Sequence, residues 1–144
     1  MNAFVKSKRI ARIASWSLAA ALACTSAVAL AETMDVKLTG AQEVPPIQGS
    51  ESGSGTVTIN DDGSVSASIS ASGFTPTAAH IHQGKAGTIG KVIVPFTKEG
   101  DKFVAPAGAK LTPEQMKAFK DGDLYVNIHS AAHPVGEVRA QLKP

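Results

Sequence analysis

The residues of this chain best suited to chemistry are its four histidines, which fall into two pairs. His80 and His82 are separated by one residue, and His129 and His133 lie much later in the chain. Residues two apart on a strand share one face, so the imidazoles of His80 and His82 can converge on one ion. Imidazole nitrogen is a common ligand of copper and zinc. The spacing predicts a metal site of His80, His82 and His129, with His133 as a fourth candidate.

Strand alternation predicts which way these side chains point. Ile81 separates the first pair, and apolar side chains at 124, 126 and 128 alternate with polar ones that end at His129. The histidines should therefore lie on an outer face, away from the apolar core. Histidines that are simply solvated there are the alternative. An unperturbed imidazole has a pKa of about 6.5, so metal affinity should fall between about pH 7 and about pH 5.

The rest of the chain must supply the elements that hold these side chains. Short alternating runs between Gly, Pro, Asn and Asp predict an all-β domain, a two-sheet Greek-key sandwich or flattened barrel. Thr112 as N-cap and Pro113 in the first turn predict one short helix over 113–120. The Ser/Gly-rich stretch 49–55 should be a mobile loop. Glu137 and Arg139 share a strand face and are predicted to form a surface charge pair.

The N-terminal segment predicts export. Four basic residues precede an uncharged run over 13–31 that ends in the sequence ALA, directly before Glu32. This is the pattern of a secretory signal peptide, which predicts a signal over 1–31, a single domain over 32–144 and a periplasmic or secreted protein. A retained membrane anchor and a lipoprotein acylated at Cys24 are the alternatives.

The charge balance of residues 32–144 limits the partners. This part has ten basic and twelve acidic residues, a net charge of −2, so it has no basic character that would attract nucleic acid or, after cleavage, a membrane. The only cysteine lies before residue 32, so the domain cannot form a disulfide. Packing or a bound ligand must stabilise it.

Three motifs give the chain a family resemblance. They are LTGAQEVPP at 38–46, AHIHQG at 79–84, and YVNIH at 125–129 followed by GEVRAQL at 136–142. In this order they resemble exported bacterial proteins with the chordin-type CHRD domain. The resemblance implies an immunoglobulin-like or superoxide-dismutase-like β-sandwich. It also implies histidine at positions 80, 82 and 129, whereas the family often has another residue at position 133.

A weaker resemblance is to the copper site of copper/zinc superoxide dismutases, which also have a His-x-His pair and a later strand-ending histidine. Here no histidine lies between Gln83 and Ile128 to bridge to zinc, so a copper-only site is what this resemblance implies. The favoured function is an exported protein that buffers or delivers copper, with zinc as a second metal. Its partners are the metal ion and, for delivery, another exported protein.

Two other functions are compatible with the sequence. An extracellular interaction module without metal would use the 42–46 segment and the glycine-rich stretch after His82 as recognition surfaces. A copper-only redox enzyme is the third hypothesis. No catalytic residues are assigned, because no Ser/His/Asp arrangement is readable. Glu43, Asn127 and Glu137 are candidates to support the metal ligands through hydrogen bonds.

Overall fold

The computed structural model describes residues 30–144. The predicted signal peptide, residues 1–31, therefore lies almost entirely outside the described residues. The first strand begins at Ala31, directly at the predicted cleavage point.

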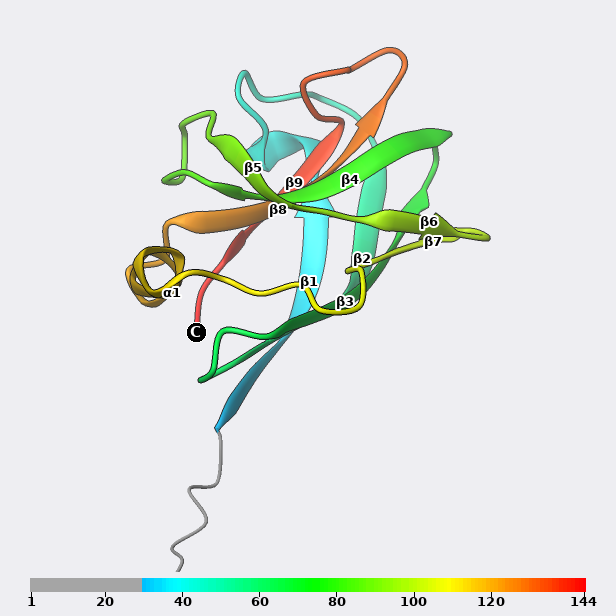
Figure 1. The fold of residues 1–144 in the computed structure, drawn as a ribbon. Coiled ribbons are helices and arrows are strands. Elements are labelled where there is room, and N and C mark those ends of the chain that lie inside the picture. Colours follow the sequence, from blue (N-terminus) through cyan, green and yellow to red (C-terminus); the bar gives the residue numbers. More distant parts are fainter. Residues whose placement is uncertain (1–29) are drawn as a thin grey trace, which may run out of the picture.

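The described chain folds into one nine-stranded antiparallel sheet that is nearly closed into a barrel (Figure 1). Its strands are β1 (Ala31–Thr39), β2 (Ser52–Asn60), β3 (Val65–Ser72), β4 (Pro76–Gln83), β5 (Lys91–Pro95), β6 (Thr97–Glu99), β7 (Lys102–Val104), β8 (Leu124–Ser130) and β9 (Val138–Leu142). A single 3-10 turn, Gly40–Gln42, follows β1. The predicted all-β class is confirmed, and the flattened barrel describes it better than two separate sheets.

The near-closure of the barrel follows from the strand order β5-β4-β8-β9-β1-β2-β3-β7-β6. The two edge strands, β5 and β6, are consecutive in the chain, with only Phe96 between them. The amide of Phe96 still donates to the carbonyl of Ala79 on β4, at 3.0 Å. The chain thus passes directly from one edge of the sheet to the other.

The prediction of a mobile loop over 49–55 is wrong for its second half. Ser52 begins β2, and this part of the strand pairs with both β1 and β3. A Cβ at Gly55 would collide with the carbonyl oxygen of Ser68, and a Cβ at Gly53 would lie 3.0 Å from Ile128 Cδ1. These glycines therefore allow close packing of the strands. A Ser/Gly-rich segment is also typical of flexible loops, which is why the sequence pattern was misleading here.

Each strand directs every second residue into the barrel, and these residues are apolar. On β8 the inward residues are Leu124, Val126 and Ile128, all with 0% exposure. Ile81 on β4 and Leu38 on β1 are equally buried in the same cluster. These are the apolar positions that strand alternation assigned to the core.

The predicted helix is α1 (Pro113–Lys120). The Thr112 side chain accepts from the Gln115 amide, and the Gln115 side chain accepts from the Thr112 amide, so the capping box is complete. Phe119 and Ala118 pack against the barrel, where α1 lies close to the C-terminus (Figure 1). Within residues 30–144, no helix has the length and apolar character needed to cross a membrane.

Because Phe119 is 2% exposed, we expect Phe119→Ala to lower the free energy of unfolding by about 3–5 kcal/mol. Lys120→Ala, an exposed position on the same helix, should change it by less than about 0.5 kcal/mol. Urea denaturation of both variants measures the difference. Equal effects would mean that α1 is not docked on the barrel as described.

Candidate metal centre

The outer face of β4, β8 and β9 carries an ordered set of polar side chains. In the strand register Asn127 lies opposite His80 on one side and Arg139 on the other. Tyr125 in the same way lies between His82 and Gln141. His129 is the last polar residue of this β8 row. The predicted alternation therefore holds, and the three histidines do share one face of the sheet.

The prediction that this face is a surface is wrong. His82 is 6% exposed and His129 is 8% exposed, and only His80 is half-buried. The supposed surface charge pair is also buried, with Glu137 at 5% and Arg139 at 1%. Loops cover the face, so it forms a second, polar interior of the domain.

Three imidazoles meet in this interior. His80, His82 and His129 can each offer a ring nitrogen such that all three nitrogens lie within 4.8 Å of one another. His80 Nδ1 and His129 Nε2 are 2.9 Å apart. The ring centroids of His80 and His82 are separated by 5.5 Å, and those of His82 and His129 by 6.0 Å. This three-histidine group could hold a metal ion.

Hydrogen bonds from the loops select which nitrogen of each ring is free. His129 Nδ1 donates to the carbonyl of Pro134 at 3.0 Å, which leaves Nε2 with its lone pair. His82 Nδ1 donates to the carbonyl of Gly90 at 3.0 Å, so His82 Nε2 is also a free donor atom for a metal. Because His129 Nε2 carries no proton, His80 Nδ1 must be the donor in the hydrogen bond between them. A bound ion would take the place of the proton in this hydrogen bond. Such backbone acceptors commonly orient metal-binding histidines.

Burial also holds these imidazoles in the form that binds metal. Desolvation, followed by the neighbouring imidazoles of His129 and His82, lowers the pKa of His80 to about 4. Burial likewise lowers the pKa of His82 and of His129, against the opposing effect of their backbone hydrogen bonds. Neutral imidazole is the ligand form, so proton competition should set in at lower pH than the unperturbed value of about 6.5 implies.

His133 does not join this group. Its Nε2 lies 3.8 Å from Glu137 Oε1, and its side chain is 43% exposed. The Ser130 hydroxyl donates to Glu137 Oε2 at 2.6 Å and accepts from the His133 amide at 2.9 Å. The structure thus places His133 in a separate polar cluster at the start of the β8–β9 loop.

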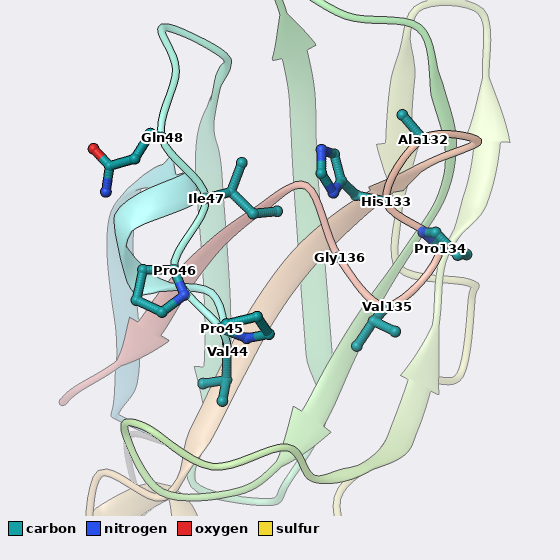
Figure 2. Close-up of a pocket in the computed structure, with 10 residues that line it drawn as sticks. All are labelled: Val44, Pro45, Pro46, Ile47, Gln48, Ala132, His133, Pro134, Val135 and Gly136. Atoms are coloured by element: carbon teal, nitrogen blue, oxygen red, sulfur yellow. The ribbon is translucent and has the colours of Figure 1, made fainter.

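The same loop forms one wall of a cleft of about 500 Å³ (Figure 2). Residues 132–136 face residues 44–48 across it, and of the four histidines only His133 lines it. The carbonyls of Pro134 and Val135, however, accept from His129 and Asn127 behind this wall. The loop therefore connects the cleft to the polar interior.

All three buried side-chain N or O atoms that lack a hydrogen-bond partner in residues 30–144 belong to this interior. They are His82 Nε2, Asn127 Oδ1 and Glu43 Oε1. An unpartnered buried polar atom costs about 1–3 kcal/mol, so three in one place indicate a site adapted to a ligand. His82 Nε2 is the atom that a bound metal would satisfy directly.

Glu43 enters this interior from the segment after the 3-10 turn. It is 6% exposed, and a Cβ at Gly136 would collide with its Oε1 and lie 2.7 Å from Asn127 Nδ2. Only glycine at position 136 leaves room for the carboxyl. Burial raises the pKa of Glu43 to about 7, although Arg139 and Asn127 act in the opposite direction.

Sequence reasoning did not identify the roles of Tyr125 and Arg139. The Tyr125 ring stacks on His82 with 4.7 Å between centroids, and the Arg139 guanidinium lies 3.4 Å from the Tyr125 ring centroid. The sequence shows only that each residue alternates with core residues on its strand, which places it on the outer face of the sheet. That these residues matter follows only once this face is known to be buried.

We expect Glu43→Gln to stabilise the domain in a pH-dependent way. Between its unfolded pKa near 4.5 and its folded pKa near 7, Glu43 ionises only in the unfolded state. As pH rises through that range, the free energy of unfolding of the wild type should therefore fall relative to that of the variant. The loss should be about 1–3 kcal/mol at pH 7 and absent at pH 4. Denaturant unfolding of metal-free protein at both pH values measures this.

Glu99→Gln, which removes an exposed carboxyl on β6, is the control for that measurement. If Glu43→Gln shifts stability equally at pH 4 and pH 7, the buried carboxyl is not held in its protonated form.

Comparison with known proteins agrees with the motif analysis. The model of the CHRD domain family matches residues 34–142, which include the whole barrel apart from the start of β1. Neither the search of curated proteins nor that of solved structures gave a significant match. The match covers most of the chain and all three histidines of the site, so this chain belongs to the CHRD domain family.

Proposed function

We propose that this protein is an exported copper-binding protein, which holds one copper ion between His80, His82 and His129 for buffering or delivery. The observation that carries this proposal is the unpartnered Nε2 of buried His82, which lies in a group of three imidazoles whose nitrogens are within 4.8 Å of one another.

The donor set supports copper as the metal. It consists of nitrogens alone, since the group contains neither cysteine nor carboxylate. Imidazole binds copper and zinc, and copper(II) binds more tightly than zinc at a given nitrogen site. The separation of 2.9 Å between His80 Nδ1 and His129 Nε2 suits two adjacent ligands of one ion with bonds of about 2.0 Å. Zinc remains the second metal of this proposal.

Delivery requires that the ion can leave, and the burial of the three ligands differs in a way that supports this. His82 and His129 are buried and fixed through their Nδ1 atoms by loop carbonyls. His80 is half-buried, and its Nδ1 contacts only the other imidazole. It is therefore the ligand through which a partner protein would approach the ion.

Export fits the same role, because an exported carrier meets copper outside the cytoplasm. Cleavage after Ala31 would leave Glu32–Thr39 of β1 to pair with β2, so the barrel would keep all nine strands. The mature domain would have no cysteine, and its stability would rest on packing and on the bound ion.

We expect untagged protein to bind one copper(II) per domain, with nitrogen ligation in its electron spin resonance spectrum. His80→Ala and His129→Gln should each lower the affinity by about 100-fold or more, because they remove a ligand rather than a supporting group. His133→Ala, outside the triad, is the matched control and should change it by less than about threefold. Titration against a competing chelator measures all four. Unchanged affinity in His80→Ala would contradict the site.

We expect the exported protein to begin at Glu32, since the cleavage pattern ends at Ala31. Intact mass of protein recovered from the periplasm or the medium tests this. Protein with residues 1–31 still attached would show instead that the segment is retained.

A further inference from the structure

Arg139 is a buried cation with no carboxylate within ion-pair distance in residues 30–144, and Glu43 acts on it only through longer-range electrostatics. It is the only arginine of residues 30–144 and is 1% exposed. Neither the Lys117–Asp121 ion pair nor the contact of His133 with Glu137 involves it. Burial of a guanidinium without a carboxylate partner is costly, so its position requires a compensating role.

The hydrogen bonds of Arg139 hold the loop between β4 and β5. Its Nη1 donates to the carbonyl of Thr88 at 2.7 Å, and its Nη2 donates to the carbonyl of Lys85 at 3.0 Å. Nη2 also donates to Gln141 Oε1 at 3.0 Å. Two arms of the planar guanidinium thus anchor two backbone positions of one loop, which the ammonium group of lysine cannot reproduce.

That loop in turn holds His82. The Gly90 carbonyl accepts from His82 Nδ1, and the Gly90 amide donates to the Tyr125 hydroxyl at 3.0 Å. The Tyr125 ring is sandwiched between the Arg139 guanidinium, 3.4 Å away, and the His82 ring, whose plane is only 6° from its own. Arg139 therefore acts on His82 twice, through the loop and through the stacked ring.

We propose that Arg139 is the positioning residue of His82 and that its fixed charge shifts the relative affinity of the three-histidine site towards a monovalent ion. This inference rests on the proposed function, because it deepens the description of the same site. Its two parts are separable by experiment, since one concerns the geometry of a ligand and the other the charge of the ion.

The charge preference follows from electrostatics. The three candidate ligands are neutral imidazoles, so they do not offset the charge of the ion. The Arg139 guanidinium lies against the Tyr125 ring, which stacks on His82. The repulsion between Arg139 and copper(II) is twice that between Arg139 and copper(I). For a separation of the order of 10 Å and an effective dielectric constant of about 20, the extra repulsion corresponds to roughly a tenfold weaker relative affinity for copper(II).

The test of the charge uses three variants of the full mature protein. Copper(I) and copper(II) affinities are measured at pH 7 with chelators specific to each oxidation state. Arg139→Gln should lower the ratio of copper(I) to copper(II) affinity about tenfold. Arg139→Lys should leave that ratio unchanged, because it keeps the charge, while both ions bind more weakly. Lys102→Gln, which removes an exposed cation on β7, should behave as wild type.

An unchanged ratio in Arg139→Gln would overturn the charge preference. Arg139→Met, an apolar side chain of similar length, is the second neutral variant. If both neutral variants fail to fold while Arg139→Lys folds, the charge serves the stability of the domain and the selectivity is also overturned.

The test of positioning needs no metal. Nitrogen NMR of metal-free protein labelled at histidine should show His82 as a single tautomer, protonated at Nδ1, in the wild type. In Arg139→Lys the same signal should report a mixture of tautomers, because the loop that carries Gly90 is released. A single tautomer in Arg139→Lys would overturn the positioning role.

These readouts separate this inference from the proposed function. A wild type that binds neither copper ion would contradict the proposed function, and the tautomer of His82 would still decide whether Arg139 positions it. A wild type that binds copper while His82 keeps one tautomer in Arg139→Lys would leave the function standing and remove the inference.

Discussion

Strand β8 is covered on both faces, by the apolar core of the barrel on one side and by loops on the other. All seven of its residues are buried. Its inner residues need only fit the barrel, but each outer residue is polar and must find a partner away from water. Hydrogen bonds to loop backbone partner His129 Nδ1, Asn127 Nδ2 and the Tyr125 hydroxyl, while Asn127 Oδ1 has no partner. The loops that cover this face therefore also fix the orientation of the side chains that form the site.

The same burial gives the site its electrostatic character. Desolvation lowers the pKa values of the three imidazoles and raises that of Glu43, so near neutral pH the groups around the site tend towards their uncharged forms. Arg139 is the exception, because burial lowers its pKa from a value high enough to leave it charged. A neutral ligand set beside one permanent positive charge distinguishes this site from a carboxylate-rich one, which would favour ions of higher charge.

The unpartnered atoms of the interior can be understood in these terms. A folded domain tolerates few buried polar groups without partners, and here His82 Nε2, Asn127 Oδ1 and Glu43 Oε1 occur together. Stability alone would favour apolar side chains at these positions. Groups that break the rules of stable packing in this way are typical of functional sites.

The sequence by itself determined the all-β class, the helix at 113–120, and the three histidines that share one face, because all of these depend on local periodicity and capping. It also supported the family assignment through three motifs in order. Only the tertiary structure decided that the outer face is buried, that 52–55 is strand and not loop, and that His133 lies apart from the triad. The strand at 52–55 depends on pairing with β1 and β3. The buried face and the place of His133 depend on how loops fold back over the sheet, through contacts such as those of Arg139 with Lys85 and Thr88, far apart in the chain. Strand alternation specifies the face of a side chain, but it carries no information on what covers that face.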